Sequence, residues 1–133
     1  MLMSMKPEPA AGTLRILIVD DNSHFLAAAS AMLEQDGVTV VGVTSNSADA
    51  LALGRQLRPD GILVDIDLGE ENGLDLARTF ASSGGAPVVL TSAYPEAELA
   101  DLIAASPAVG FVSKSELSAS AVRRLIVTEP SPG

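Results

Sequence analysis

Cysteine and tryptophan are absent from this chain of 133 residues, and aromatic residues make up only 3% of it. Without cysteine the chain forms neither a disulfide framework nor a thiolate metal site, which suits a reducing compartment such as the cytoplasm. Basic residues are also scarce, since 8 Lys and Arg stand against 17 Asp and Glu and give a formal net charge of -9. Nonspecific binding to nucleic acid or anionic lipid needs clustered basic residues, so we expect neither partner.

Long apolar runs are missing as well, and none approaches the length needed to span a bilayer. The first residues include Pro7 and Pro9 but no extended apolar stretch, which is not typical of a secretory signal. We therefore expect a cytoplasmic protein with a flexible leader over residues 1–13, one domain over residues 14–127 and a flexible tail over residues 128–133. A domain of this size buries about two thirds of the surface of its unfolded chain, which is enough for one core.

The chain does contain short β-branched apolar runs that alternate with segments of helical spacing, a pattern that predicts an α/β fold with a parallel sheet. The expected strands are 14–19, 38–43, 61–66, a run that opens at Pro87, and 109–112. The expected helices are a segment from Phe25 that Gly37 ends, 45–57 with Asn46 or Ser47 as its cap, 72–81, 95–105 and 115–127. Right-handed crossovers in this (βα)5 order place helices on both faces of the sheet and produce a three-layer sandwich.

Polar residues follow four of these strands at the point where each strand ends. Asp20 and Asp21 follow the first strand and Asp65 follows the third. Ser92 follows the fourth strand and Lys114 the fifth. In a sheet of strand order 2-1-3-4-5 the first and third strands are neighbours, and ligands bind at the carboxyl ends of the strands. We therefore expect these side chains to face one crevice.

Three carboxylates in one crevice favour a divalent cation. Two like charges at ~4 Å repel by roughly 4 kcal/mol in an effective dielectric of 20, so the cluster needs a cation or extra protons. Mg²⁺ prefers oxygen ligands and is commonly completed by phosphate oxygens, which points to phosphoryl chemistry. Lys114 and Ser92 would then supply positive charge and a hydrogen-bond donor to the phosphoryl group. Asp65 would be the nucleophile and form an aspartyl phosphate.

At these residues the chain resembles the receiver domain of bacterial two-component response regulators, a flavodoxin-like and CheY-like fold, over about residues 14–127. No single motif is specific, but five motifs of the family occur in order. They are the acidic pair Asp20-Asp21, the phosphoacceptor Asp65, Gly73 eight positions later, the hydroxyl and small residue Ser92-Ala93, and Phe111 three positions before Lys114.

The resemblance implies a phosphorylation-operated switch in a phosphorelay. A histidine kinase or a histidine phosphotransfer protein would donate the phosphoryl group to Asp65. By the same resemblance Mg²⁺ is held by Asp21, Asp65 and the backbone carbonyl of Asp67, with Asp20 binding directly or through water. The chain would then act as no enzyme beyond its own phosphorylation and dephosphorylation.

The resemblance also implies where the signal leaves the domain. Ser92 and Phe111 are the expected switch residues, and the approach of Ser92 and Lys114 to the phosphoryl group would shift the loop and helix after the fourth strand. The last two helices and the fifth strand would then form the surface for an output partner or a homodimer. The run from Gly110 to Leu117 is similar to receivers of regulators with LuxR-type output domains, which implies a role in transcription regulation.

The chain departs from the family pattern at three places. Leu68-Gly69 replaces the usual Met-Pro after the phosphoacceptor, and Glu70-Glu71 then adds charge to what we expect to be a solvated loop. Ser115 replaces the Pro that commonly follows the lysine. Phe111 has no hydroxyl, which excludes a switch of the Tyr type that hydrogen-bonds at the output face.

Two other functions stay open from the sequence. The first is a receiver-like interaction module that works without phosphorylation, which the unusual loop and the missing Pro allow. The second is a phosphatase, because Asp65-Ile66-Asp67 also resembles the nucleophile and acid-base pair of haloacid dehalogenase-type enzymes. That family expects Thr or Val where this chain has Gly69, and it gives Asp20-Asp21 no role.

Overall fold

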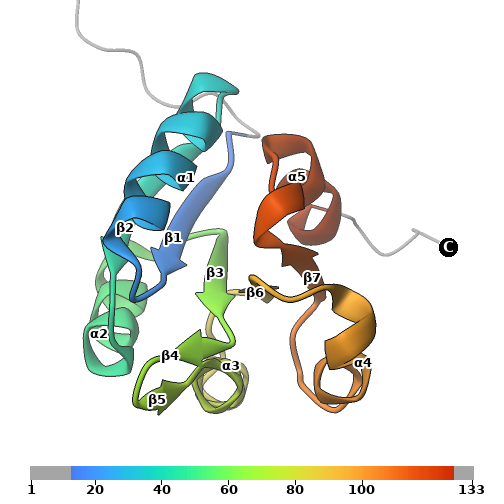
Figure 1. Cartoon of the computed structure of the whole chain (residues 1–133). Helices are drawn as coiled ribbons and strands as arrows, with labels where there is room; N and C mark the ends of the chain where they lie inside the picture. Colours follow the sequence, from blue (N-terminus) through green and yellow to red (C-terminus); the bar gives the residue numbers. More distant parts are fainter. Residues whose placement is uncertain (1–12, 128–133) are drawn as a thin grey trace, which may run out of the picture.

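The computed structural model describes residues 13–127, so the expected tail and all but the last residue of the expected leader lie outside the described residues. Five parallel strands form one sheet in the order β2-β1-β3-β6-β7. They are β1 (Arg15–Val19), β2 (Thr39–Thr44), β3 (Gly61–Asp65), β6 (Val88–Ser92) and β7 (Gly110–Ser113). Counted among themselves, these strands have the predicted order 2-1-3-4-5, which confirms the fold (Figure 1).

Helices cover both faces of the sheet. One face packs against α1 and α5, and the other packs against α2, α3 and α4 (Figure 1). Their bounds are α1 (Ser23–Gln35), α2 (Ser47–Leu57), α3 (Gly73–Ser82), α4 (Glu96–Ala104) and α5 (Ala119–Ile126). Within residues 13–127 no helix is long and apolar enough to cross a membrane.

Successive residues of the central strands belong to different halves of the core. Leu17 and Val19 pack on the side of α2 and α3, whereas Ile16 and Ile18 pack on the side of α1 and α5. All four side chains are at most 1% exposed. Because both faces of the sheet are covered, a central strand here is an unbroken apolar run rather than an alternating one. The first polar residue after such a run therefore marks the carboxyl end of the strand.

Three of the helices that begin at the carboxyl edge of the sheet are capped by asparagine side chains. Asn22 accepts a hydrogen bond from the N–H of Phe25 at the start of α1, Asn46 caps α2 and Asn72 caps α3. Asn is among the preferred N-cap residues because its side-chain oxygen satisfies a helix N–H that has no partner within the helix. The predicted cap of the second helix was Asn46 or Ser47, and the structure selects Asn46.

The prediction of a continuous last helix from Ser115 is wrong. A 3-10 turn, η1 (Lys114–Glu116), follows β7, and Leu117 is extended before α5 begins at Ala119. The side chain of Ser118 accepts a hydrogen bond from the N–H of Ala121, so this serine is the cap of α5. Every peptide bond of the described residues is trans.

The prediction of a solvated loop after the third strand is also wrong in part, because this segment contains a short hairpin. β4 (Asp67–Leu68) pairs antiparallel with β5 (Glu71–Asn72) across a turn of two residues. Gly69, the first turn residue, has φ +76, and a two-residue hairpin turn of type II′ requires Gly at this position. The hairpin is anchored by Leu68, which is 4% exposed.

Candidate functional site

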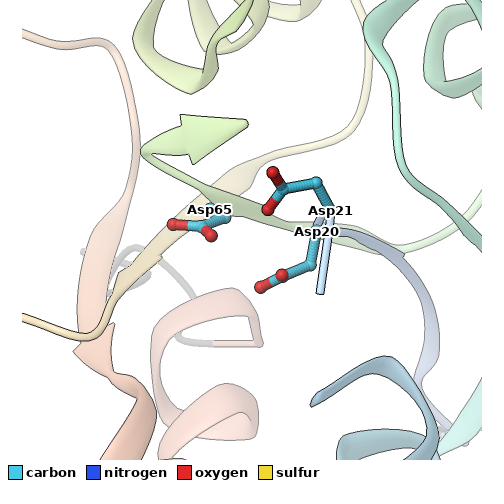
Figure 2. Close-up of side chains that lie close together, drawn as sticks. All are labelled: Asp20, Asp21 and Asp65. Atoms are coloured by element: carbon cyan, nitrogen blue, oxygen red, sulfur yellow. The ribbon is translucent and has the colours of Figure 1, made fainter. Parts of the chain in front are cut away.

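The carboxylates of Asp20, Asp21 and Asp65 meet at the carboxyl edge of two neighbouring strands. Asp20 and Asp21 directly follow β1, and Asp65 is the last residue of β3, which pairs with β1. One oxygen of each carboxylate lies within 4.8 Å of the others (Figure 2). Asp20 is fully buried and Asp65 is 5% exposed, whereas Asp21 is exposed to solvent. The structure thus brings together the acidic residues that the sequence placed at one crevice.

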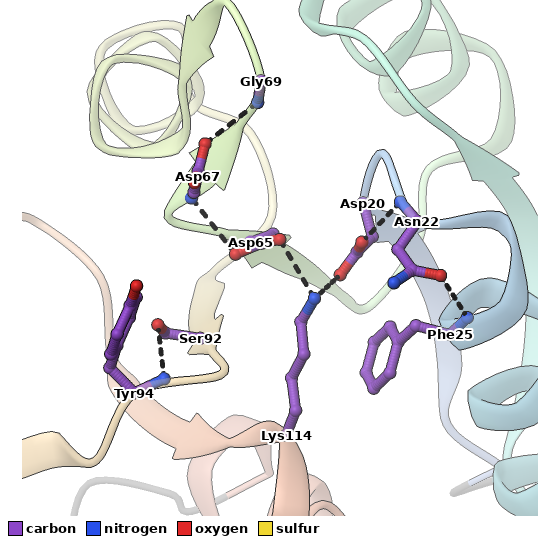
Figure 3. Close-up of polar contacts among 9 residues, drawn as sticks. All are labelled: Asp20, Asn22, Phe25, Asp65, Asp67, Gly69, Ser92, Tyr94 and Lys114. Atoms are coloured by element: carbon purple, nitrogen blue, oxygen red, sulfur yellow. Dashed lines mark hydrogen bonds and ion pairs between the residues drawn. The ribbon is translucent and has the colours of Figure 1, made fainter.

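Lys114 joins this cluster from the end of the fifth parallel strand. Its Nζ lies 2.8 Å from Oδ2 of Asp20 and 3.1 Å from Oδ2 of Asp65 (Figure 3). The contact with Asp65 is a hydrogen bond, but the contact with Asp20 is an ion pair without hydrogen-bond geometry. Oδ2 of Asp20 is therefore a buried oxygen with no hydrogen-bond donor among the described residues.

The surroundings shift the pKa of both partners of that hydrogen bond. Burial raises the pKa of Asp65 above its ordinary value, and the nearby charge of Asp20 adds to this. The N–H of Asp67 and the ammonium of Lys114 pull the pKa of Asp65 down without reversing the shift. Burial alone would lower the pKa of Lys114, but its contacts with the two carboxylates outweigh burial and raise it. Lys114 is therefore firmly charged, and ionised Asp65 lacks part of the stabilisation that water would give.

These residues fit a hard divalent cation. One ammonium faces three carboxylates, so negative charge remains in excess. The buried Oδ2 of Asp20 is ion-paired with Lys114 but accepts no hydrogen bond among the described residues, so it can take a further partner. All the donors are carboxylate oxygens, which suit Mg²⁺.

The β4–β5 hairpin borders the same cluster. The N–H of Asp67 donates a hydrogen bond of 3.1 Å to Oδ1 of Asp65, while the carboxylate of Asp67 accepts one from the N–H of Gly69 (Figure 3). The exposed Asp67 carboxylate is thus engaged in its own turn and lies outside the group of three. A Cβ on Gly69 would lie 3.0 Å from Oδ2 of Asp21, so the turn approaches the cluster closely. The carbonyl of Asp67 as a metal ligand stays a prediction.

Ser92 is buried at the end of β6, with 4% exposure. Its Oγ accepts a hydrogen bond of 3.0 Å from the N–H of Tyr94, a bond that leaves the hydroxyl proton available (Figure 3). Among the described residues no hydrogen bond joins Ser92 to Asp65. The side chain of Tyr94 is 61% exposed and so does not cover the cluster in this state.

Phe111, the expected aromatic switch residue, is partly buried in β7. It pairs in register with Leu90 of β6, and its ring packs against the core on the side of α2 and α3. The ring also borders a small surface hollow of about 240 Å³ between α4 and α5. Phe111 therefore lies between the core and the surface expected for output.

Three residues of this region were not assigned a site role from the sequence. The ring centroid of Phe25 lies 4.5 Å from Nζ of Lys114, although the sequence placed Phe25 only at the start of the first expected helix. Gly73 touches the backbone of Asp65, so that a Cβ there would overlap its carbonyl oxygen. Glu71 accepts a hydrogen bond of 2.8 Å from the N–H of Ser47. The position of Phe25 three residues after Asn22, in the first turn of the helix that follows the acidic pair, was the available signal for the first of these.

A five-stranded parallel sheet of this order, with an acidic cluster and a lysine at its carboxyl edge, defines a receiver-like domain. The family model of the response regulator receiver domain matches residues 16–125, and the chain therefore belongs to this family. The chain is a receiver domain of the two-component response regulators, as its motifs predicted.

Similar proteins include both enzymes and transcriptional regulators. The chain is 36% identical over 104 residues to protein-glutamate methylesterase/protein-glutamine glutaminase 5 of Myxococcus xanthus, covering 76% of this chain and 30% of that protein. It is 27% identical over 105 residues to the transcriptional regulatory protein PdtaR of Mycobacterium tuberculosis, covering 79% of this chain and 51% of that protein. The chain thus spans about half or less of the length of these relatives.

Solved structures agree with this assignment. The signal receiver domain of NarL from Mycobacterium tuberculosis superposes with a TM-score of 0.79 at 25% identity, covering 88% of this chain and 98% of that domain. A LuxR-family two-component response regulator from Aurantimonas sp. gives a TM-score of 0.73 at 25% identity, covering 85% of this chain and 82% of that chain. Receiver domains take phosphoryl groups from histidine kinases, bind Mg²⁺ through acidic residues and connect to output domains. The phosphatase alternative finds no support in the family match.

Proposed function

We propose that this chain is a switch that accepts a phosphoryl group on Asp65 from a histidine kinase or a histidine phosphotransfer protein. The observation that carries the proposal is the position of Lys114, whose ammonium contacts the buried carboxylates of Asp65 and Asp20 together. A carboxylate that accepts a phosphoryl group needs fixed positive charge beside the oxygens that carry the new negative charge. Lys114 supplies that charge without titrating near neutral pH, because its pKa is raised.

In the transfer step a carboxylate oxygen of Asp65 forms a new P–O bond while the P–N bond of the donor phosphohistidine breaks. The leaving imidazole nitrogen takes up a proton from solvent, and Asp65 becomes an acyl phosphate. Mg²⁺, held by Asp20, Asp21, Asp65 and the backbone carbonyl of Asp67, would supply positive charge to the phosphoryl oxygens. The N–H of Asp67 holds one oxygen of Asp65 and Lys114 holds the other, so the two donors together orient the carboxylate.

The switch begins with Ser92 in this proposal. Its Oγ now accepts a hydrogen bond from Tyr94, and its free hydroxyl proton is suited to donate to a phosphoryl oxygen. Movement of Ser92 toward Asp65 would pull on the Tyr94 backbone and so on the loop before α4. Phe111 would respond by turning inward beside the strand.

The output surface would be α4, β7 and α5. None of the residues of α4 is buried, and Leu102 and Val109 are each 48% exposed. Such exposed apolar residues suit an output partner or a second copy of the chain. The acidic balance makes direct binding of nucleic acid by this chain unfavourable, so any role in transcription would act through another domain or protein. We propose a cytoplasmic location, with which the lack of cysteine agrees.

The deciding experiment is incubation with Mg²⁺ and acetyl phosphate, followed by intact-mass spectrometry. We expect one hydroxylamine-sensitive phosphoryl group per chain, located on Asp65 by peptide mapping. The Asp65→Asn variant should take up none, while Asp75→Asn, which changes an exposed carboxylate on α3, should be labelled like the native chain.

The alternatives give different results. Repeated turnover of a phosphomonoester without a stable phosphoprotein would identify a phosphatase. A native chain that stays unlabelled by acetyl phosphate and by several phosphorylated histidine phosphotransfer proteins would identify an interaction module that works without phosphorylation.

A further inference from the structure

Phe25 stands in direct contact with the lysine of the site. Its ring belongs to the first turn of α1, and the ring centroid lies 4.5 Å from Nζ of Lys114. A cation within about 6 Å of a ring centroid, over its face, is attracted by the negative face of the aromatic ring. Figure 3 shows the ring beside the lysine side chain, on the opposite side from Asp65.

The local sequence fixes Phe25 relative to the acidic cluster. The N–H of Asn22 donates a hydrogen bond of 2.9 Å to Oδ1 of Asp20, and the side chain of Asn22 accepts one of 3.0 Å from the N–H of Phe25 (Figure 3). One asparagine therefore links the buried carboxylate to the first turn of the helix. The half-buried ring also packs against the core under α1, which limits its freedom.

Within residues 13–127, the ammonium of Lys114 thus interacts with three side chains of two kinds. Two of them, Asp20 and Asp65, attract the ammonium by their charge at 2.8 and 3.1 Å. The third is the neutral ring of Phe25. A divalent cation on the carboxylates would offset their attraction for the ammonium and add repulsion of its own, because Coulomb energies between charges are additive. The attraction of the ring contains no such charge and is retained.

We infer that Phe25 is a positioning residue that holds the ammonium of Lys114 beside Asp65 when a divalent cation occupies the acidic cluster. The inference rests on the proposed function, since it is the phosphoryl acceptor that needs the ammonium. Without the ring, the flexible side chain of Lys114 would be pushed toward solvent once the carboxylate charges are satisfied. The side chain is only 18% exposed at present, so the contact is largely desolvated and its effect is not screened away.

The sharpest test changes the charge distribution of the ring and nothing else. The protein contains three phenylalanines, so fluorinated phenylalanine must be introduced at position 25 alone. Each added fluorine weakens the negative face of the ring while shape and packing stay nearly the same. We expect the logarithm of the phosphorylation rate constant with acetyl phosphate, at saturating Mg²⁺, to fall stepwise with the number of fluorines. The trifluorinated protein and Phe25→Leu should be about three- to tenfold slower than the native protein.

Two substitutions with ordinary amino acids complete the test. Phe25→Trp restores an aromatic face and should recover most of the rate. Leu26→Ala removes a partly buried neighbour on α1 that packs in the same core, so it should lower the melting temperature without slowing phosphorylation. This control separates a positioning role from a general loss of stability.

A second readout does not depend on phosphorylation. The ring current of Phe25 should shift the ε-methylene proton resonances of Lys114 upfield in the NMR spectrum, and this shift should persist when Mg²⁺ is added. In Phe25→Leu we expect the shift to be absent and the ε-methylene group to become more mobile on addition of Mg²⁺.

The outcomes are separable. If the native protein is phosphorylated but the fluorine series gives equal rates, Phe25 has no positioning role and the proposed function stands. If the native protein takes no phosphate, the proposed function fails, and the Lys114 resonances with Mg²⁺ still decide the contact. A ring-current shift that vanishes in the native protein on addition of Mg²⁺ would overturn the inference.

Discussion

Gly73 leaves no room for a side chain against Asp65, because a Cβ at position 73 would overlap the backbone carbonyl oxygen of Asp65. The N–H of Gly73 donates a hydrogen bond of 2.8 Å to the carbonyl of Ile66, which ties the start of α3 to the end of β3. Gly73 therefore lets α3 approach the end of β3 closely. We expect the position of Asp65 to depend on this close approach.

We expect Gly73→Ala to destabilise the fold and to displace Asp65. Overpacking in a core typically costs about 1–3 kcal/mol, and the obstacle here is backbone, which cannot rotate away. Urea unfolding measures the loss of stability, and labelling by acetyl phosphate at a temperature where the variant is folded measures the displacement. Gly84→Ala is the matched control, since no atom lies within 4 Å of that Cβ although its φ is +75. It should lose roughly 1–2 kcal/mol and keep its labelling.

Asp65→Asn should make the metal-free protein more stable at pH 7. Burial raises the pKa of Asp65 in the folded state, so the folded state binds this proton more tightly than the unfolded state does. That contribution to stability is present below the ordinary pKa of 3.8 and is lost as the pH rises through the folded-state value. Asparagine carries no such cost at neutral pH.

The measurement is urea unfolding in EDTA, from pH 7 down to below the ordinary pKa of 3.8. The advantage of Asp65→Asn over the native protein should shrink as the pH falls and vanish below the ordinary pKa of the carboxyl. Asp75→Asn, at an exposed position, should show no comparable dependence. A native protein that is more stable than Asp65→Asn at pH 7 would show that the ion pair with Lys114 outweighs burial.

Lys114→Met should bind Mg²⁺ more tightly than the native protein, by roughly tenfold, because it removes a positive charge that competes for two of the ligands. In EDTA the same variant should be less stable, since two buried carboxylates lose their counter-charge. Calorimetric Mg²⁺ titration and melting curves with and without Mg²⁺ measure the two effects. Lys114→Arg keeps the charge and should show neither. Equal Mg²⁺ affinity in the native protein and Lys114→Met would mean that the cation binds away from Asp20 and Asp65.

Much of this site could be predicted from the sequence because the ends of buried parallel strands can be recognised there. A strand buried on both faces is an unbroken apolar run, so the first polar residues after it, such as Asp20 and Asp65, mark the edge where ligands bind. The order of the strands then decides which ends are neighbours. That reasoning depends only on the backbone, and it placed Lys114 with the carboxylates.

What could not be predicted depends on side-chain direction and on very short elements. The β4–β5 hairpin has two residues in each strand, too few for any periodicity, and a turn of Gly69 and Glu70 looks like an ordinary acidic loop. The break before α5 depends on whether Ser115 or Ser118 acts as the cap. Both are serines, which suit that role, so residue type does not distinguish them. The contact of Phe25 with Lys114 joins residues far apart in the chain.

The attachment of the β4–β5 hairpin to α2 should depend on Glu71 rather than on Glu70. Glu71 accepts a hydrogen bond of 2.8 Å from the N–H of Ser47, in the first turn of α2, where a negative charge is favourable. We expect Glu71→Gln to lose about 0.5–1.5 kcal/mol of stability and Glu70→Gln to lose little. Hydrogen exchange of the Ser47 amide should accelerate in Glu71→Gln alone. Similar exchange rates in the two variants would show that the hairpin is not held to α2 by this bond.

Phosphorylation should change the conformation of α4 more than that of the other helices. This helix has no buried residue and Pro95 provides no side-chain cap, so few contacts resist its movement. A phosphoryl group favours the active arrangement only by its differential contacts, here with Ser92 and Lys114. Amide NMR spectra with and without beryllofluoride, a mimic of the phosphoryl group, should show the largest changes over α4, β7 and α5. Phe111 should shift with them, because its ring lies between the core and this surface.

In Ser92→Ala the mimic should still bind while the changes over α4 become smaller, since the hydroxyl acts after the charge has arrived. Changes confined to residues beside Asp65, with Phe111 and α4 silent, would exclude output through this surface. Full changes over α4 in Ser92→Ala would instead remove Ser92 from the switch and leave Lys114 as the residue that transmits the signal.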